Sequence, residues 1–505
     1  MALAIIYSRA SSGITAPLVT VEAHLSFGMA GFFIVGLPEA AVKESRDRVR
    51  SALLNTHFEF PSKRITINLA PADLPKEGGR FDLPIALGIL AASGQIPVES
   101  LETYEFTGEL ALSGELRPVR GILPVVLSSW QSGRQLIVPF HNSDEAALVQ
   151  QAKVLSAKHL LEVCAHLKGD QLLTSCMRHD SESQLENALD IADVKGQVQA
   201  KRALEVAAAG QHSLLYLGPP GTGKTMLASR LPGILPDLTE QQALEVAAVA
   251  SVSSQGFNPG TWKKIPFRSP HHTSSSVALV GGGRPPRPGE ISLAHHGVLF
   301  LDELPEFHRH VLECMREPLE SGSITISRAA IQMSFPAFFQ LIATMNPCPC
   351  GYAGSKSESC QCSNEQIKRY LGKISGPLLD RIDMHVEVTR LPPEFLIQAN
   401  QHEAETSATV RERVILSREV QKQRQGKLNS VLTVPELDHY GKVDADAERL
   451  LTHAVVKFNL SARAYHRIVK VSRTIADLEG SAVIKAIHLG EALNYRCLDR
   501  SRIMI

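Results

Sequence analysis

Eight consecutive residues, GPPGTGKT at positions 218–225, have the spacing of a phosphate-binding loop. They follow the apolar run SLLYL and precede the helix-forming segment MLASRL, so the loop joins a strand to a helix. In such a loop the glycines let backbone N–H groups surround phosphate oxygens at the amino terminus of a helix. A chance glycine turn is the alternative, and the flanking strand and helix disfavour it. We therefore predict that ATP binds at Gly218, Pro219, Pro220, Gly221, Thr222, Gly223, Lys224 and Thr225.

Polar side chains with separate tasks surround this loop in the predicted fold. Lys224 would reach the β- and γ-phosphates, and the Thr225 hydroxyl would be a ligand of Mg²⁺. Downstream, the apolar run VLFL ends in Asp302 and Glu303. Because the carboxyl ends of parallel strands meet at the edge where the phosphate loop lies, we expect Asp302 to hold Mg²⁺ and Glu303 to polarise the attacking water. An acidic pair that merely ends a strand in solvent is the alternative.

A third apolar strand, FFQLIATM, ends at Asn346, which could position the lytic water; the alternative is a plain turn asparagine before proline. The segment GPLLDRID carries Arg381, a candidate arginine finger, which acts only across a subunit interface. Arg463, Arg467 and Lys470 recur at helical spacing and so share one face. That face is either a solvated basic surface or one from which Arg463 reaches the γ-phosphate.

Four of the eight cysteines lie together in NPCPCGYAGSKSESCQC, residues 346–362. Four thiolates closing on one tetrahedral ion suit a structural zinc site with no open position. The alternative is four free, reduced thiols. We predict a zinc site at Cys348, Cys350, Cys360 and Cys362 with a structural role.

Two histidine pairs, His271-His272 and His295-His296, also suggest metal ligands. Adjacent histidines point apart in an extended segment, and the neighbouring sequence offers no carboxylate or cysteine to complete a ligand set. We interpret both pairs as loop and structural residues.

Composition is that of an ordinary globular protein, with 44% apolar and 21% charged residues. Lys plus Arg and Asp plus Glu number 52 each, so the sequence offers no support for coating DNA over the whole surface, although a local basic channel is compatible with it. No run of apolar residues is long enough to span a membrane. The start has neither a basic region nor an adequate apolar core for a signal peptide, so we expect reduced thiols and a cytoplasmic location.

The chain divides by pattern into four parts. Residues 1–165 alternate short apolar runs with Gly- and Pro-containing turns, which indicates an α+β domain. A polar linker at 166–189 follows. Residues 190–390 alternate strands and helices, as in a parallel-sheet α/β domain, and contain the cysteine loop at 348–362. Residues 391–505 show only helical periodicity and predict a small helical domain.

Long segments of the chain resemble the magnesium-chelatase-like AAA+ ATPases, among them DVKGQVQAKRALEVAAAGQHSLLYLGPPGTGKT, FRSPHHTSSSVALVGGGRPPRPGEISLAHHGVLFLDELPEF and GPLLDRIDMHVEV. The resemblance implies an AAA+ core followed by a helical lid, with Asn346 as sensor one, Arg381 as the arginine finger and Arg463 as sensor two. It also implies that Val194 and Gln197 line an adenine pocket. Members of the family assemble as homo-hexameric, ATP-dependent rings, and the branch most similar to this chain contains DNA helicases that promote branch migration during natural transformation, a setting in which a recombinase would be a further partner.

The resemblance further implies two insertions that face the pore of such a ring, near residues 268–292 and 320–336. The second, GSITISRAAIQMSFP, reads as two short strands around a turn at Ser327-Arg328-Ala329. A basic residue at a hairpin tip, repeated in every subunit, could grip a phosphate backbone with little sequence preference. We predict DNA contacts at Arg328 first and at Arg284 and Arg287 second; a surface arginine on a turn is the alternative.

The first domain resembles the ChlI-like and Lon-protease-like fold, on the segments PKEGGRFDLPIALGIL and TGELALSGELRPVRGILPV. In the protease these segments carry a Ser/Lys dyad. Here no serine occurs from Lys76 to Ile89, and Leu123 stands at the lysine position. Proteolysis is therefore disfavoured. A DNA motor and a chelatase-type ATPase that remodels a protein partner are the two functions to distinguish.

Overall fold

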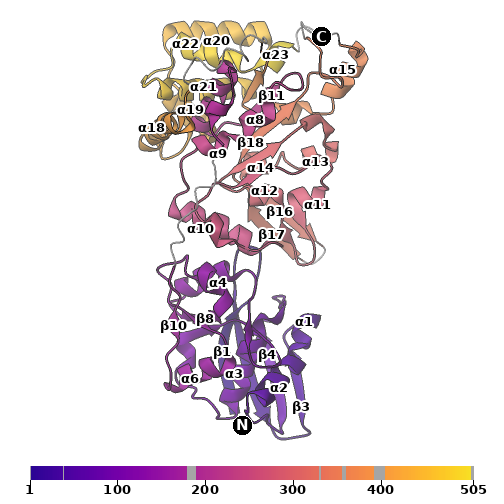
Figure 1. Cartoon of the computed structure of the whole chain (residues 1–505), viewed down its shortest axis with the longest axis vertical. Helices are drawn as coiled ribbons and strands as arrows, with labels where there is room; N and C mark the ends of the chain where they lie inside the picture. Colours follow the sequence, from indigo (N-terminus) through magenta and orange to yellow (C-terminus); the bar gives the residue numbers. More distant parts are fainter. Residues whose placement is uncertain are drawn as a thin grey trace.

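The structure is a computed structural model that describes residues 2–37, 39–178, 189–328, 331–354, 360–391 and 404–501. Figure 1 shows an elongated molecule, with the amino-terminal region at one end, a parallel-sheet region in the middle and a helical carboxy-terminal region at the other end. Within the described ranges no helix combines the length and the apolar character that crossing a bilayer requires.

The amino-terminal region is built on an eight-stranded mixed sheet in the order β10-β9-β8-β5-β1-β2-β4-β3. Its strands are β1 (Ala2–Arg9), β2 (Leu18–Ser26), β3 (Gly31–Val35), β4 (Arg64–Ala70), β5 (Tyr104–Phe106), β8 (Gln135–Pro139), β9 (Val154–Ala157) and β10 (Thr174–Ser175). A small hairpin, β6 (Glu109–Leu110) with β7 (Leu116–Arg117), lies outside this sheet. The helices are α1 (Ala40–Lys43), α2 (Ser45–Asn55), α3 (Asp82–Ala92), α4 (Ile122–Gln131), α5 (Ser143–Ala146) and α6 (Leu160–Lys168).

Alternation along β2 explains how this sheet packs. Every second residue from Val19 to Leu25 is buried, so one face of the strand covers the core. The helix α3, with the sequence DLPIALGILAA, is buried at every position and fills that core against β1 and β2. The mixed sheet with covering helices confirms the predicted α+β character of this end of the chain.

The middle region contains a five-stranded sheet in the order β12-β15-β18-β11-β19, and every neighbouring pair is parallel. The strands are β11 (Leu214–Leu217), β12 (Phe267–Arg268), β15 (Val298–Leu301), β18 (Gln340–Met345) and β19 (Met384–Glu387). Both β15 and β18 are buried along their whole length, as is typical of strands covered on both faces. The sequence of β15, VLFL, is an unbroken apolar run, whereas β18 also buries the polar residues Gln340 and Thr344. The prediction of a parallel sheet is confirmed, and β18, the third predicted strand, lies between β11 and β15.

Short helices and two hairpins surround this sheet. The helices are α7 (Val198–Gly210), α8 (Lys224–Ser229), α9 (Leu231–Ile234), α10 (Glu240–Ser251), α11 (Ser276–Val280), α12 (Glu290–Leu293), α13 (Arg309–Glu313), α14 (Pro318–Ser321), α15 (Asn364–Leu371) and α16 (Gly376–Leu379). The hairpins are β13 (Gly281–Gly282) with β14 (Arg287–Pro288), and β16 (Ser323–Arg328) with β17 (Ile331–Pro336).

The second hairpin forms where the sequence predicts it, but two residues of the predicted turn belong to its first strand. Ser327 pairs with Gln332 and Arg328 pairs with Ile331, so both belong to the ladder and not to the turn. Of the predicted turn, Ala329 lies outside the described residues.

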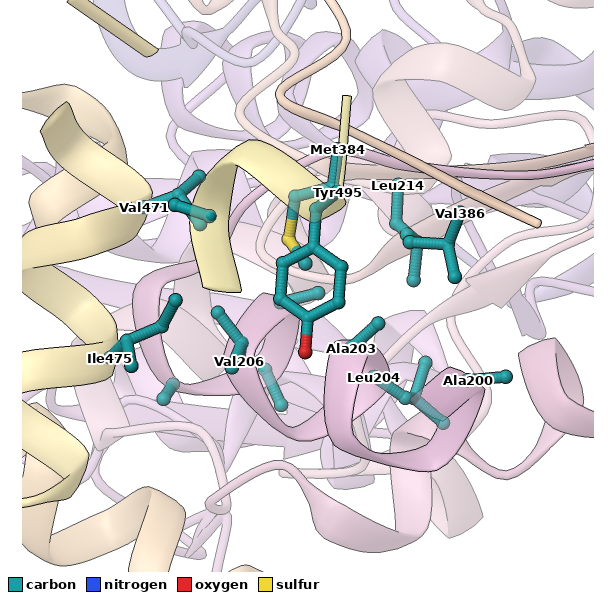
Figure 2. Close-up of a cluster of buried hydrophobic side chains, with 14 of the residues drawn as sticks. Ala200, Ala203, Leu204, Val206, Leu214, Met384, Val386, Val471, Ile475 and Tyr495 are labelled. Atoms are coloured by element: carbon teal, nitrogen blue, oxygen red, sulfur yellow. The ribbon is translucent and has the colours of Figure 1, made fainter. Parts of the chain in front are cut away.

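The carboxy-terminal region is helical, as predicted, with α18 (Ser407–Gln425), α19 (Val434–Tyr440), α20 (Ala445–Phe458), α21 (Ala462–Leu478), α22 (Ala486–Asn494) and α23 (Cys497–Ser501). It packs on the sheet region through one continuous apolar cluster. Figure 2 shows side chains of α7, of the sheet and of α21 meeting around Tyr495, among them Ala203, Val206, Leu214, Met384, Val386, Val471 and Ile475.

The amino-terminal and middle regions meet where α10 packs on α4 (Figure 1). Ala247 and Ala248 of α10 belong to the same buried cluster as Ile122 and Val126 of α4. The backbone N–H of Gly121, immediately before α4, donates to the carbonyl of Ser251 at 3.1 Å. These contacts fix the first region against the second.

Candidate nucleotide site

The predicted site residues gather at the carboxyl ends of three adjacent strands. Leu217 pairs with Met345, and Leu301 pairs with Ala343, so β11, β18 and β15 end side by side. The phosphate loop (residues 218–225) follows β11, Asn346 follows β18, and Asp302 follows β15. One crevice thereby receives side chains from three segments that are far apart in the sequence.

Glycines in the phosphate loop meet two separate geometric demands. A Cβ on Gly218 would lie 2.1 Å from the carbonyl oxygen of Val388, so only glycine lets β11 leave the sheet at this point. Gly223 adopts a left-handed conformation with φ of 86° at the start of α8. The loop therefore ends at the amino terminus of α8, where backbone N–H groups can bind phosphate oxygens.

Lys224 is buried inside this loop. Its Nζ donates to the carbonyls of Gly218 at 2.7 Å and Pro219 at 2.8 Å, and to Oδ1 of Asn346 at 3.1 Å. Burial lowers the pKa of the Lys224 ammonium to about 8, against the opposing charges of Asp302 and Glu303. The ammonium thus lies in direct contact with the predicted sensor asparagine.

The magnesium ligands predicted from sequence also contact each other. The Thr225 hydroxyl donates to Oδ2 of Asp302 at 3.1 Å. The second carboxylate oxygen, Oδ1, accepts a hydrogen bond from the hydroxyl of Thr344 on β18. A hydroxyl and a carboxylate are oxygen donors of the kind Mg²⁺ binds, so these two residues fit the ion.

Thr344 is a residue that the sequence analysis missed. Besides donating to Asp302, its hydroxyl accepts the backbone N–H of Glu303 at 3.1 Å. Thr344 is 1% exposed and lies on β18, two residues before Asn346. One buried hydroxyl therefore orients both acidic residues at the end of β15.

Glu303 adopts a left-handed backbone conformation with φ of 53°, which is uncommon for a residue other than glycine and is frequent at functional sites. Its side chain is 51% exposed, and Oε2 lies 3.8 Å from Nδ1 of His272. His272, interpreted above as a loop residue, is thus a neighbour of the predicted catalytic carboxylate.

The two residues predicted to line an adenine pocket have different environments. Gln197 donates to the carbonyls of Thr222 at 3.2 Å and Thr389 at 2.8 Å, so it ties the phosphate loop to the end of β19. Val194 is 3% exposed and belongs to the apolar core.

The two predicted arginines lie apart from this crevice. Arg381 donates to Oε1 of Glu320 at 2.7 Å and to the Pro377 carbonyl at 2.7 Å. Arg463, on α21, approaches the same Oε1 at 3.7 Å. The hydrogen bond from Arg381 lowers the pKa of Glu320.

Glu320 and Arg381 line a cavity of about 330 Å³ at the opposite edge of the sheet. Ser213, which precedes β11, and Gln340, the first residue of β18, also line it. Parallel strands of four to six residues span about 13–20 Å. The cavity lies at the amino ends of these strands, so about one strand length separates it from the phosphate loop at their carboxyl ends. The sequence interpretation that Arg463 reaches back to the γ-phosphate does not describe this arrangement, because α21 brings Arg463 to the edge where Arg381 lies.

A buried ion pair holds the same edge together. Arg467 contacts Asp383, and the Asp383 carboxylate accepts from the backbone N–H of Ser213 at 2.8 Å. Burial alone would raise the pKa of Asp383, but the charge of Arg467 and hydrogen bonds from His212 and Ser213 hold it far below its usual value. Arg467 therefore joins α21 to the sheet.

The four clustered cysteines converge after Asn346. The Sγ atoms of Cys348, Cys350 and Cys360 lie 3.3–3.7 Å apart, and all four sulfur atoms, that of Cys362 included, lie within 4.8 Å of one another. Tetrahedral zinc with Zn–S bonds of about 2.3 Å needs sulfur atoms about 3.8 Å apart, so the sulfur atoms fit the ion. Residues 355–359 of this loop lie outside the described ranges.

The cysteine loop packs directly on the phosphate loop. A Cβ on Gly351 would lie 2.6 Å from Cδ of Pro220. An ion held by the cysteines would therefore stabilise the backbone beside the nucleotide site.

The second histidine pair has a carboxylate neighbour that the sequence analysis did not find. Glu245 on α10 lies 3.3 Å from Nε2 of His295 and 2.7 Å from Nε2 of His296, and the rings lie together, with centroids 3.9 Å apart. The backbone N–H of Phe338 donates to Nδ1 of His295 at 3.1 Å, which leaves the ring proton on Nε2. A metal needs a lone pair on Nε2, so the cluster does not fit a metal. Burial and then His296 lower the pKa of His295 to about 4, and the neutral ring is a structural hydrogen-bonding group.

The predicted DNA contacts fall on the two hairpins. Arg328 is the last residue of β16. Arg284 is exposed in the loop between β13 and β14. Arg287, in β14, is half-buried and lines a cavity against the amino-terminal region.

Comparisons with known proteins agree with this geometry. Residues 190–396 match the family described as magnesium chelatase, subunit ChlI; residues 21–142 match subunit ChlI of Mg-chelatase, and residues 404–496 match the carboxy-terminal part of that subunit. Competence protein ComM of Haemophilus influenzae is 54% identical over 505 residues, which is 99% of this chain and 98% of that protein. A protein of Escherichia coli K12 named YifB is 50% identical over 501 residues, with 99% and 98% of the two chains covered. Lon protease 2 of Bacillus subtilis is 28% identical over 129 residues, 25% of this chain and 22% of the protease. The chain therefore belongs to the magnesium-chelatase-like AAA+ ATPase family, in the group that contains ComM and YifB.

Proposed function

We propose that this chain is an ATP-driven, homo-hexameric DNA motor that moves branched or single-stranded DNA in the cytoplasm during recombination of incoming DNA. The observation that carries the proposal is the division of the site between two edges of one sheet. Lys224, Thr225 and Asp302 form half of an ATPase site at one edge, while Arg381 lies at the other. Such a chain completes its site only when a neighbour supplies the missing guanidinium.

Each predicted group has a defined task in hydrolysis. Lys224 exchanges its bonds to the Gly218 and Pro219 carbonyls for phosphate oxygens, since a charged donor binds a charged acceptor more strongly than a neutral one. Glu303, oriented by Thr344, takes up a proton from the attacking water, and Asn346 holds that water. Arg381 of the adjacent subunit stabilises charge that develops on the γ-phosphate, and we assign Arg463 to the same interface. Mg²⁺ held by Thr225 and Asp302 would neutralise charge on the phosphates.

Movement along DNA would come from the hairpins. Hydrolysis loosens one subunit interface, and the β16–β17 hairpin with Arg328 shifts relative to its neighbours. Arg328 and Arg284 would contact backbone phosphates and so read little sequence. The relation to ComM favours DNA as substrate, and a recombinase is the partner we expect at the same junctions.

A chelatase-type ATPase that remodels a protein is the second candidate, because the family matches are to chelatase subunits. The full-length relation to ComM and the cysteine cluster beside the phosphate loop favour the motor. The two functions differ in one measurement: forked DNA should stimulate ATP hydrolysis by the motor and leave the remodeller unchanged.

A subunit-mixing experiment tests the shared site directly. Lys224→Ala removes the phosphate ligand, and Arg381→Ala removes the guanidinium offered to the neighbour. Each variant alone should be inactive, whereas a mixture should regain hydrolysis, because a Lys224→Ala subunit donates its intact Arg381 to an Arg381→Ala neighbour. Light scattering with ATP and Mg²⁺, with and without forked DNA, measures assembly in parallel. Failure of the mixture to regain activity, with rings present, would refute the shared site; an absence of DNA stimulation would refute the motor alone.

A further inference from the structure

A second cavity, of about 80 Å³, lies at the junction of the amino-terminal and middle regions. Glu77, Arg80 and Arg120 line it from the first region, and Arg287 lines it from the β13–β14 hairpin. Arg80 belongs to the segment PKEGGRFDL, where the Ser/Lys dyad of the related proteases is missing. The cavity thus occupies a part of the chain to which hydrolysis of ATP gives no role.

Arg80 is the central group of this cavity. It is 9% exposed, and its Nη2 donates to the backbone carbonyl of Arg120 at 2.9 Å. Its Nη1 is buried and has no hydrogen-bond partner among the described residues. Burial lowers the pKa of Arg80 to about 10, so the guanidinium is charged at neutral pH. A buried charged donor without an acceptor is costly, and an anion in the cavity would satisfy it.

Positive charges outnumber negative charges around the cavity. Three arginines line it, and Glu77 is the carboxylate among the lining residues. Burial and then Glu39 raise the pKa of Glu77 to about 7, with Arg80 and Arg287 acting in the opposite direction. Gly121, the residue before the ten-residue helix α4, also lines the space, so the positive end of that helix dipole adds to the field.

We propose that this cavity binds one phosphate-sized oxyanion, held by Arg80 and Arg287, which joins the amino-terminal region to the β13–β14 hairpin. A volume of about 80 Å³ accommodates a single phosphate group. Arginine guanidiniums bind phosphate oxygens through paired, charge-assisted hydrogen bonds, which explains a cluster of arginines in place of lysines. The phosphate is either a free ion or one group of a DNA backbone.

Equilibrium dialysis of the full chain with radiolabelled inorganic phosphate, in the presence of saturating ADP and Mg²⁺, tests the site. We expect Arg80→Gln and Arg287→Gln each to weaken phosphate binding by about tenfold or more, since each removes a charged donor. Glu77→Gln should strengthen binding severalfold, because it removes the opposing carboxylate. Arg117→Gln is the matched control: it removes an exposed arginine of β7 that does not line the cavity, and binding should stay unchanged.

The comparison between variants is independent of the nucleotide site. All four variants keep the phosphate loop, so phosphate bound there contributes equally to each. Arg287 lies on a half-buried hairpin and its replacement tests the site even if Arg80→Gln unfolds the chain. Equal phosphate binding by wild type and Arg287→Gln, or weaker binding by Glu77→Gln, would overturn the proposal.

A second arm separates the two sources of phosphate. A fluorescent single-stranded oligonucleotide is titrated with wild type and Arg287→Gln, with and without excess inorganic phosphate. If the site holds a DNA phosphate, the wild type should bind more tightly than the variant and phosphate should remove that difference. If the ion is free phosphate, dialysis should show the expected loss while oligonucleotide binding is the same for both proteins.

Discussion

Replacement of Thr344 with valine removes one hydroxyl and keeps the size and β-branched shape of the side chain. The hydroxyl donates to the Asp302 carboxylate and accepts the N–H of Glu303. A hydrogen bond to a charged group contributes about 1.5–3 kcal/mol. If the bond to Asp302 acts fully in the transition state, kcat/KM for ATP should fall by about 10- to 160-fold, because about 1.4 kcal/mol corresponds to a tenfold change in rate.

The assay is steady-state ATP hydrolysis at limiting and saturating Mg²⁺, with Thr344→Ser as the matched control. Serine keeps the hydroxyl and loses only a methyl group, so its activity should stay within about threefold of wild type. Far-ultraviolet circular dichroism and a thermal melt establish that both variants are folded. Wild-type activity in Thr344→Val, or equal impairment of the valine and serine variants, would show that the hydroxyl does not orient the acidic pair.

Three further predictions follow from the site and the core. The pKa of Lys224 is about 8 without nucleotide, so ADP affinity measured by calorimetry should fall as pH rises from 7 to 9.5, whereas Lys224→Arg should give a flat profile. Elemental analysis of protein purified without chelator should give one zinc per chain. Cys348→Ser should lose the zinc and bind ADP more weakly, because the cysteine loop packs on the phosphate loop. Cys176→Ser, outside the cluster, should retain the zinc and the wild-type affinity for ADP. In denaturant titrations, Tyr495→Ala should lower the free energy of unfolding of the sheet and helical regions by about 3–5 kcal/mol. Tyr495→Phe should lower it by only about 1 kcal/mol, since Phe keeps the ring and loses the hydrogen bond to Glu491. Equal losses for the two variants would contradict the packing in Figure 2.

The sequence predicts features that are local. The phosphate loop is eight contiguous residues between a strand and a helix, and Asp302 ends an apolar run, so both can be recognised without knowing the fold. The β16–β17 hairpin is equally local, although Ser327 and Arg328 extend its ladder and do not form the predicted turn. The parallel sheet follows from apolar runs that lack alternation.

Features that depend on register or on packing between distant segments were not predictable. Thr344 meets Asp302 only because β15 and β18 pair with Leu301 opposite Ala343. Glu245 meets His295 because α10 packs against the segment that contains His295, although the two residues are fifty positions apart in the sequence. The side of the sheet on which Arg463 lies depends on how α21 docks, and helical spacing carries no signal for that.

Glu320 has a consequence for how rings could form. In the isolated chain this one carboxylate is a counter-ion for both arginines that we assign to a neighbour's phosphates. In the ring that we propose, assembly would exchange the Glu320 carboxylate for the polyphosphate of a neighbour's nucleotide. The exchange would be favourable only when the neighbour carries nucleotide. A neighbour with an empty phosphate loop offers no compensating anion. Added salt should weaken the ion pair of the exposed Arg463 with Glu320 more than that of the buried Arg381. Subunit association would then report the nucleotide state before any hydrolysis occurs.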